Sequence, residues 1–494
     1  MTLNGKSRLF GLMMCSAFLL LAGCAVGPNF KKPVAPAVPG YTPTPPPTTS
    51  STPNVPDGEA QRFVNGRDIP GDWWTLFHSQ PLNDLIERSL KNNPNIKAAQ
   101  AALVVARENV LAQRGAYYPS VSASFAVDHS KTSAELSPFT ASGDLYYSLY
   151  TPEVSVSYVP DVFGLNRRTV ESLKAQEQQA RFALVATHIT LSSNVAAAAI
   201  QEASLRGQVD ATRQLIEINT NMLEVLRKQF DKGYVGSLDV AAQEAQLAQI
   251  TATLPPLVKQ LAQQRDLLAA LSGGFPSQDL AEKFELSSLQ LPQDLPLSLP
   301  SQLVEQRPDV RQAEENMHSA SAQIGVAVAN RFPSFALTGD IGTMALVFTR
   351  MFAPGAVFWD VGASATQPIF EGGTLLHKER VAKAAYDEAD QQYRATVLTA
   401  FQNVADTLNA LEQDADGLKA AAAAADAAKK TLDLTQKQMQ VGYVNYLALL
   451  NAEQSYQQAL INLVQAQSNR YSDTAALFQA LGGGWWNRPD LPKN

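Results

Sequence analysis

The sequence predicts an α+β chain made of two similar halves, each with a pair of β-strands and a pair of very long helices. The first observation is an internal repeat, in which motifs at residues 93–96 and 118–120 recur at 307–310 and 332–334, 214 positions later. The second is a pair of proline-free stretches of about 65 residues, long enough for helices of roughly 100 Å. The third is a set of four runs in which apolar and polar residues alternate. Because the halves are similar, they should share one order of elements.

The amino terminus has the pattern of a bacterial lipoprotein signal. Lys6 and Arg8 precede an apolar run at residues 9–22, and Leu-Ala-Gly stands directly before Cys24. The run is too short for a permanent membrane helix. We therefore expect residues 1–23 to be a lipoprotein signal peptide and Cys24 to begin the mature chain, carrying covalent diacylglycerol and palmitate. A plain signal peptide is the alternative.

Residues 24–70 are predicted to form a lipidated, extended tether, because residues 28–56 are rich in Pro, Thr and Ser and have few large apolar side chains to bury. Regular structure is expected to begin near Trp73. Apolar positions then recur at helical spacing to about Arg114, and Pro94 should interrupt this helix.

Strand hairpins are predicted at residues 117–163 in the first half and 333–370 in the second. Apolar and small polar residues alternate in each of them, which places the two kinds of side chain on opposite faces of a strand. Four strands cannot close a membrane barrel, and open strand edges are not tolerated in lipid. Several copies must therefore pool their strands; this argument allows two, three or four.

Long helix pairs are predicted at residues 167–271 and 374–481. Each pair turns at a Gly-Tyr-Val motif, at 233–235 and 442–444, and each ends at glycines, as helices often do. Each of these helices has apolar stripes on two flanks, so it can pack between two neighbouring helices in the wall of a tube. A long coiled-coil stalk is the alternative. The repeats thus occupy residues 71–274 and 301–484, with a linker at 275–300 and a tail at 485–494.

Composition argues against several classes of protein. The chain has 39 Lys and Arg against 46 Asp and Glu, without a basic tract that could follow a nucleic-acid backbone. Cys15 lies in the signal, so redox chemistry and cysteine metal sites are excluded from the mature chain. The five histidines lack metal-ligand spacing, and no nucleophile elbow, phosphate loop or dinucleotide fingerprint occurs. We expect neither an enzyme nor a cofactor.

Four motifs carry a resemblance to a known family. They read PSQLVEQRPDV at residues 300–310, RFPS at 331–334, GYVNYL at 442–447 and LGGGW at 481–485. In this order, and with the duplication and the lipoprotein signal, the chain resembles the TolC-like outer membrane efflux proteins, or outer-membrane factors, and within them the lipoprotein branch similar to OprM and the NodT-type factors. The resemblance covers nearly the whole mature chain.

The resemblance implies a homotrimer whose twelve strands form one transmembrane β-barrel, continued into the periplasm by an α-helical barrel. It implies the exit duct of a tripartite efflux system in the outer membrane of a Gram-negative bacterium. The partners would be a periplasmic adaptor (membrane fusion) protein, an inner-membrane transporter of RND or MFS type and outer-membrane lipid; drugs, toxic organics or other small solutes would pass without catalysis. The outer-membrane component of a type I protein secretion system is the alternative, and a non-pore lipoprotein with a coiled-coil stalk is a further one.

The resemblance also implies that the two Gly-Tyr-Val turns are the periplasmic tips, used for adaptor docking and gating. The residues assigned to this site are Gly233, Tyr234, Val235, Ser237, Asp239, Gly442, Tyr443, Val444, Asn445 and Tyr446. A tight turn explains the two glycines equally well. Related channels often have an aspartate where this chain has Val444, so an acidic gate at that position is in doubt. Because the tips differ in sequence, we expect one helix pair to move and the other to stay fixed.

Overall fold

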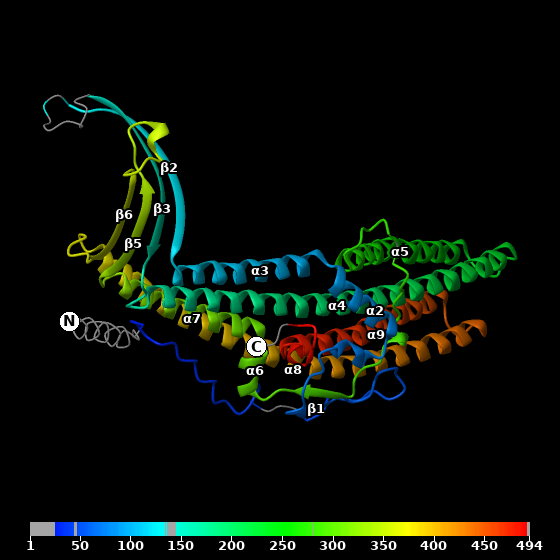
Figure 1. Cartoon of the computed structure of the whole chain (residues 1–494). Helices are drawn as coiled ribbons and strands as arrows, with labels where there is room; N and C mark the ends of the chain where they lie inside the picture. Colours follow the sequence, from blue (N-terminus) through cyan, green and yellow to red (C-terminus); the bar gives the residue numbers. More distant parts are fainter. Residues whose placement is uncertain (1–24, 44–46, 134, 136–144, 279, 492–494) are drawn as a thin grey trace. The chain divides into compact units, whose positions relative to one another are not determined.

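The structure is a computed structural model that describes residues 25–43, 47–133, 135, 145–278 and 280–491 (Figure 1). The chain divides into two compact units. Unit 1 comprises Met1–Pro33, Leu103–Gln179 and Ala313–Tyr393. Unit 2 comprises Val34–Ala102, Ala180–Gln312 and Arg394–Asn494. Each unit therefore combines segments from both sequence repeats.

Unit 1 contains a curved antiparallel sheet (Figure 1). Its strands are β2 (Ser120–Lys131), β3 (Tyr146–Tyr158), β5 (Ser334–Thr343) and β6 (Val357–Thr366), in the order β2-β3-β5-β6. The alternating runs predicted these strands, and each half of the sequence supplies one hairpin. The hairpins join through β3 and β5, so β2 and β6 are the edges of the sheet.

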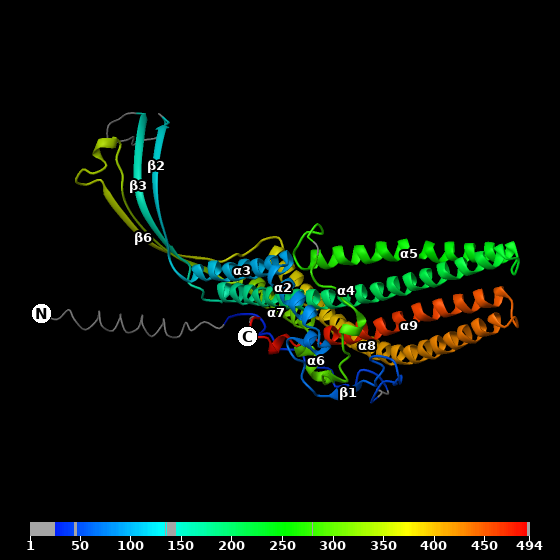
Figure 2. The same ribbon diagram turned by 90° about the vertical axis from the view of Figure 1, so that its right-hand side faces the viewer.

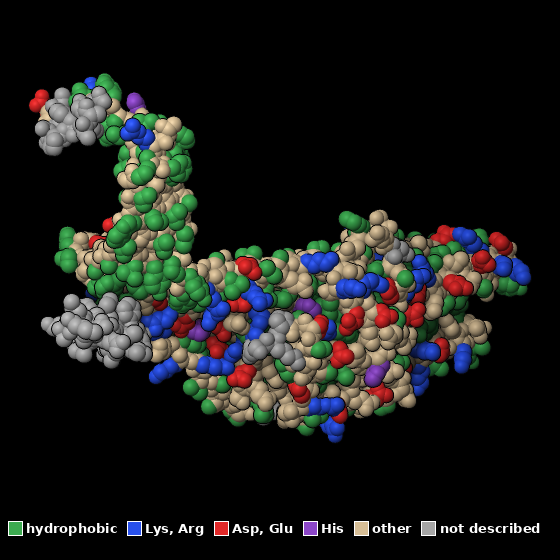
Figure 3. Space-filling view, in the orientation of Figure 1, with side chains coloured by type: hydrophobic (Ala, Val, Ile, Leu, Met, Phe, Trp, Pro, Cys, Tyr) green, Lys and Arg blue, Asp and Glu red, His purple; other side chains and the backbone are tan. Residues whose placement is uncertain are grey.

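The register of the sheet separates apolar from polar side chains. On one face Val154 lies opposite Ile341, and Ile341 lies opposite Trp359. On the other face Ser155 lies opposite Asp340, and Asp340 lies opposite Asp360, because successive strand residues point to opposite faces. Figure 3 shows hydrophobic side chains over much of this sheet, and Trp359 is 73% exposed. An exposed apolar face of this size marks a surface made for another apolar phase.

Two helix pairs repeat the same interruption. α2 (Gln80–Asn92) is followed by α3 (Pro94–Arg114), and α6 (Pro300–Gln306) is followed by α7 (Pro308–Ala329). The intervening residues, Asn93 and Arg307, are extended, because a proline disfavours helical geometry in the residue before it. The predicted break at Pro94 is confirmed.

The longest helices follow the proline-free stretches. α4 (Leu165–Asp231) and α8 (Thr374–Gln440) have 67 residues each, and α5 (Ser237–Leu271) and α9 (Tyr446–Ala480) have 35 each. In unit 2, α4 with α5 and α8 with α9 form two hairpins that lie side by side (Figures 1 and 2). α4 also contains an 18-residue window apolar enough to cross a membrane, but 67% of that window is buried in the protein, as in a core helix.

Regular structure begins earlier than near Trp73, so that expectation was wrong. β1 (Arg62–Asn65) lies in the predicted tether and pairs in parallel with β4 (Asp294–Leu297), which lies in the predicted linker. Each strand has only four residues, too few for a periodic signal. Short 3₁₀ helices complete the described elements: η1 (Trp73–Phe77), η2 (Gly115–Tyr117), η3 (Leu286–Ser288), η4 (Phe348–Arg350) and η5 (Trp485–Asn487).

Residues 47–65, called the strap below, are held against α9 by buried hydrogen bonds. Arg470, 1% exposed, donates to the carbonyl oxygens of Asp57 (2.8 Å) and Glu59 (2.9 Å). The Tyr471 hydroxyl donates to a carboxylate oxygen of Asp57. Gln61 Nε2 donates to Thr474 Oγ1 at 3.1 Å. Because these groups are buried and paired, the strap is part of the folded body of unit 2.

Candidate functional site

The two hairpin turns have the same backbone structure. Gly233 N donates to Phe230 O (2.8 Å) and Tyr234 N to Gln229 O (2.9 Å). In the second turn, Gly442 N donates to Met439 O and Tyr443 N to Gln438 O in the same pattern. This is the Schellman motif, which places a residue in the left-handed region after the helix; the φ angles of the two glycines are +79° and +78°. The repeat therefore extends to the hydrogen bonds of the turns.

Each turn ends at a capped helix, but the caps differ. Asp239 Oδ2 accepts from Gly236 N at 3.1 Å at the start of α5. Asn445 Oδ1 accepts from Ala448 N at 3.0 Å at the start of α9. Both side chains satisfy backbone donors that a helix start leaves unpaired. The Asp239 carboxylate therefore has a structural role at the tip.

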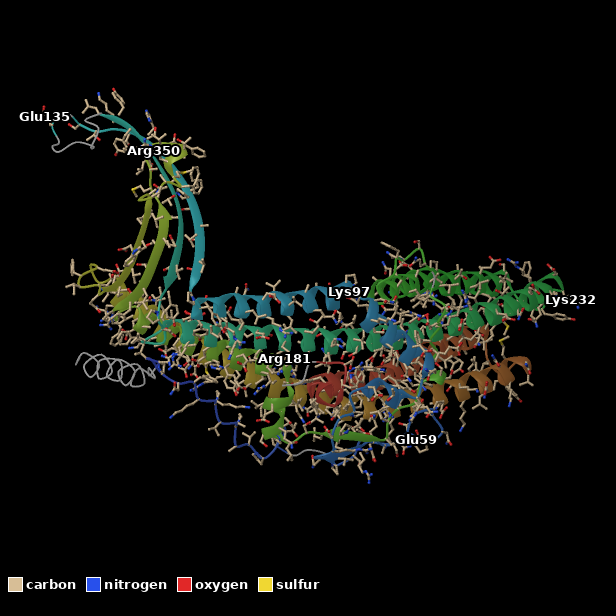
Figure 4. The ribbon with its side chains drawn as sticks, in the orientation of Figure 1. Glu59, Lys97, Glu135, Arg181, Lys232 and Arg350 are labelled. Carbon is tan, nitrogen blue, oxygen red and sulfur yellow. The ribbon has the colours of Figure 1, made fainter. Side chains whose placement is uncertain are left out.

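The predicted tip residues fall into two groups. Tyr234 and Tyr443 are 78% and 84% exposed, and Figure 4 shows the neighbouring Lys232 at the end of the first hairpin. Gly233, Ser237, Gly442 and Asn445 are also exposed, whereas Val235, Asp239 and Val444 are partly buried. Tyr446 is only 7% exposed. The structure thus gives Tyr446 a place in the packing between the hairpins, and Tyr234 and Tyr443 a place on the surface.

The two hairpins pack together through an apolar cluster just behind the turns. The buried side chains of this cluster are Leu226 of α4, Leu432 of α8, and Tyr446, Leu449, Leu450 and Ala452 of α9. Beside this cluster lies a cavity of about 810 Å³ between the hairpins. Predicted site residues that line this cavity are Tyr234, Val235, Asp239, Val444, Asn445 and Tyr446. The tip is therefore incompletely filled where the hairpins meet.

One buried ionisable residue, Glu453, directly follows Ala452 of this cluster on α9. Glu453 is 3% exposed, and neither of its carboxylate oxygens has a hydrogen-bond partner in the described part of the chain. Burial raises the pKa of Glu453 to about 7, because a charged carboxylate is costly away from water. Burial, followed by the Glu453 and Asp239 carboxylates, also raises the pKa of the Tyr446 hydroxyl.

The lipidation residue, Cys24, lies outside the described residues. The segment that follows it is fastened to unit 1 by Arg168, 4% exposed, which donates to Val26 O (3.0 Å), Gly27 O (3.3 Å) and Asn29 Oδ1 (2.8 Å). Val26 N donates to Phe163 O at 3.1 Å. The chain next to the predicted lipid site is therefore bound to the protein.

A second contact holds the same segment farther along. The ring of Phe30 stacks on His318, with centroids 4.4 Å apart. The pKa of His318 is raised: the hydrogen bond to Glu315 has the largest effect, burial opposes it, and the hydrogen bond to Glu171 raises the pKa further. Since the imidazolium form is favoured, the aromatic stack gains a cation–π component at acid pH.

Metal chemistry has no obvious place in the described residues. No group of three or more His, Cys, Asp or Glu side chains in them is arranged to hold a metal ion.

An amphipathic sheet and paired long helices fit the class of outer-membrane channel proteins. Residues 85–274 and 299–483 match the family model described as outer membrane efflux protein, and the chain belongs to this family. It is thus an efflux protein of the outer membrane of a Gram-negative bacterium.

Individual relatives are similar over almost their whole length. The toluene efflux pump outer membrane protein TtgC of Pseudomonas putida is 27% identical over 486 residues, covering 97% of this chain and 96% of the relative. Nodulation protein T of Rhizobium leguminosarum bv. trifolii is 25% identical and covers 94% and 96%. The solved structure of the outer-membrane channel OprN has a TM-score of 0.83 at 25% identity, covering 94% of this chain and all of that one.

Sequence reasoning assigned no role to Glu453, Arg168 or Arg470. A signal for Glu453 was present in the repeat. The two Gly-Tyr-Val turns lie 209 positions apart, and at this shift Glu453 corresponds to Glu244 and Gln436 corresponds to Arg227. The first repeat has the ion pair, with Arg227 Nη2 2.7 Å from Glu244 Oε1; the second repeat keeps the acid and lacks the base.

Proposed function

We propose that three copies of this chain form the exit duct of a tripartite efflux system. Their sheets would close one twelve-stranded barrel, and their long helices would form the periplasmic tunnel. The duct would carry drugs, toxic organics or other small solutes delivered by an inner-membrane transporter of RND or MFS type and a periplasmic adaptor. The name of the relative TtgC, a toluene efflux pump protein, supports the class of small organic solutes.

The observation that carries this proposal is the amphipathic sheet with open edges. β2 and β6 have no partner strand on their outer sides within the described sheet. Unpaired backbone groups are not tolerated in the hydrocarbon core of a membrane, so β6 of one copy must pair with β2 of the next. The apolar face, with Val361 75% exposed, suits lipid, and the face with Asp340 and Asp360 suits a water-filled lumen.

At the other end, the hairpin turns are proposed as the adaptor-docking surface and the closable entrance. Tyr234 and Tyr443 are exposed on similar turns, and large amphipathic rings of this kind are common at binding hot spots. The cavity behind the turns leaves room for the hairpins to rearrange. Opening would separate one helix pair from the other.

The duct proposal predicts ion conductance that depends on the packing of the tip. In planar bilayers, the purified trimer should conduct, and Leu449→Ala should raise its conductance. Leu449 is fully buried in the cluster between the hairpins, and its truncation should weaken that packing by about 2–5 kcal/mol. Leu447→Ala is the control, because Leu447 is 62% exposed. A protein silent in both variants and in the wild type would contradict the duct.

Lipid attachment is proposed at Cys24, on the strength of the signal pattern. Cys24→Ser should abolish incorporation of labelled palmitate into the mature chain, since the thiol is the acceptor. Cys15→Ser should leave labelling unchanged, because Cys15 lies in the removed signal. Labelling of the Cys24→Ser protein would overturn the proposal.

A further inference from the structure

The two repeats treat one glutamate in opposite ways. Glu244, in the first repeat, is 49% exposed at its side chain and pairs with Arg227 across the α4–α5 hairpin. Its equivalent, Glu453, is 3% exposed, and the residue equivalent to Arg227 is the neutral Gln436. An exposed pair of this kind contributes little to stability, whereas a buried carboxylate without a partner is costly. The second repeat thus has the acid at the tip without the base that pairs with it in the first repeat.

The position of Glu453 on its helix explains why it is buried. α9 presents Tyr446, Leu449, Leu450 and Tyr456 to the cluster between the hairpins, at the three- and four-residue spacing of one helix face. Glu453 lies in the middle of this stripe. The Glu453 side chain therefore enters the contact between the two hairpins, where water cannot hydrate a charged carboxylate.

Other polar groups near this contact are also left without partners. The Tyr446 hydroxyl and Gln243 Oε1 make no hydrogen bond to the described residues. Gln243 is fully buried and uses its Nε2 on Asn219 O (2.9 Å) and Asn219 Oδ1 (3.0 Å). Each unpaired buried polar atom lowers the stability of the packed tip, because it has given up hydrogen bonds to water without gaining others.

The ionisable neighbours do not neutralise Glu453. Tyr446 lies on the same face of α9 as Glu453. The Asp239 carboxylate at the start of α5 acts on Tyr446 as a second acid. Arg227 of α4 is engaged by Glu244 of α5. α8 contributes the neutral Gln436, next to the exposed Lys437. Burial is the cause of the raised pKa of Glu453.

We propose that Glu453 is a proton-operated latch of the duct: its neutral form lets the α8–α9 hairpin pack on α4–α5, and its ionised form releases it. This inference rests on the proposed function, in which the hairpin ends are a closable entrance. It assigns the mobile part to the second repeat, where the buried acid lies, and the fixed part to the first.

The direction in which pH changes the stability of the packed tip follows from proton linkage. An ordinary glutamate titrates near 4.5, whereas Glu453 in the packed tip titrates at about 7. The packed state therefore holds the proton more tightly and is most stable at acid pH. Its population relative to the released state falls as the pH rises from about 4.5 to 7, by a factor on the order of 10², and changes no further above that window. An outer-membrane duct would thus be tighter in an acid medium.

The test uses the full-length trimer in lipid nanodiscs, with spin labels at two exposed positions, Lys232→Cys on the first hairpin and Lys437→Cys on the second. The distance distribution between the labels is measured from pH 5 to pH 8. In the wild-type background we expect a short distance at pH 5 and a growing long-distance population toward pH 8. Conductance in planar bilayers is recorded over the same range and should rise in parallel.

Three variants separate the latch from a general effect of pH. Glu453→Gln should keep the short distance at every pH, because the neutral amide mimics the protonated acid. Gln436→Arg, which restores the base of the first repeat, should also remove the pH dependence, since the carboxylate would be paired in the packed state. Glu244→Gln, the matched control, should leave the pH dependence as in wild type.

The outcomes distinguish the latch from the duct. A pH-dependent distance that persists in Glu453→Gln overturns the latch, as does a wild-type distance that is constant from pH 5 to pH 8. Absence of conductance at every pH and in every variant contradicts the duct, while the spin-label distances still decide whether Glu453 controls the packing.

Discussion

Arg470→Ala should release the strap, residues 47–65, from unit 2. The guanidinium of Arg470 is 1% exposed and holds the carbonyl oxygens of Asp57 and Glu59. Each buried acceptor left without its donor costs roughly 1–3 kcal/mol. We expect the strap to lose about 3 kcal/mol of local stability, so that its amides exchange hydrogen about a hundredfold faster. Hydrogen exchange followed by mass spectrometry on the intact trimer measures this directly.

Arg62→Ala is the matched control, because Arg62 lies in the strap itself and also makes hydrogen bonds. Its partner is Asp294, at 3.0 Å, but the two side chains are 65% and 38% exposed. An exposed pair contributes about 0.2–1 kcal/mol, so exchange in the strap should change by less than about tenfold. Equal effects of the two substitutions would show that the buried position of Arg470 is unimportant for the strap.

Gly484→Ala should destabilise unit 2 more than Gly66→Ala does. Gly484 has φ +67°, and a Cβ there would lie 2.4 Å from Pro70 O and 2.7 Å from Ile69 O. The left-handed backbone costs a non-glycine residue about 1 kcal/mol, and the overlap with two backbone carbonyls adds about 1–3 kcal/mol. We expect the free energy of unfolding to fall by about 3 kcal/mol. Circular dichroism should show this as a lower midpoint of thermal unfolding.

Gly66→Ala separates the cost of left-handed backbone strain from the cost of steric overlap of the new Cβ. Gly66 has φ +74°, and nothing lies within 4 Å of the Cβ position. Only the backbone strain applies, so the free energy of unfolding should fall by about 1 kcal/mol. The midpoint of thermal unfolding should fall by less than half as much as in Gly484→Ala. Similar drops would mean that Pro70 and Ile69 move away at little cost.

Much of the fold could be predicted because its signals are local. The alternation at residues 121–128 depends only on which face of a strand each side chain takes. α4 and α8 follow from long stretches without proline, and the turns at Gly233 and Gly442 follow from a residue that tolerates positive φ. The resemblance to the efflux family rested on motifs in the same local order, and the family match over residues 85–274 and 299–483 confirms it.

The site could be predicted only in part. Sequence reasoning found both turns, but it treated Tyr446 like Tyr234 and Tyr443, whereas Tyr446 is buried and the other two are exposed. It also could not tell that Glu453 is buried, since Glu453 and Glu244 occupy equivalent places in the repeat. Whether a helix position faces water depends on which other helix packs on it, and that is not a local property.

The sequence by itself determined the order of the elements, the duplication and the type of each helix and strand, because backbone preference and periodicity act within a few residues. Only the tertiary structure decided that β1 pairs with β4, that Arg470 holds the strap, and that one of the two equivalent glutamates, Glu453, is buried. These facts depend on contacts between segments far apart in the chain, and burial, which arises from those contacts, is what shifts the pKa of a carboxylate.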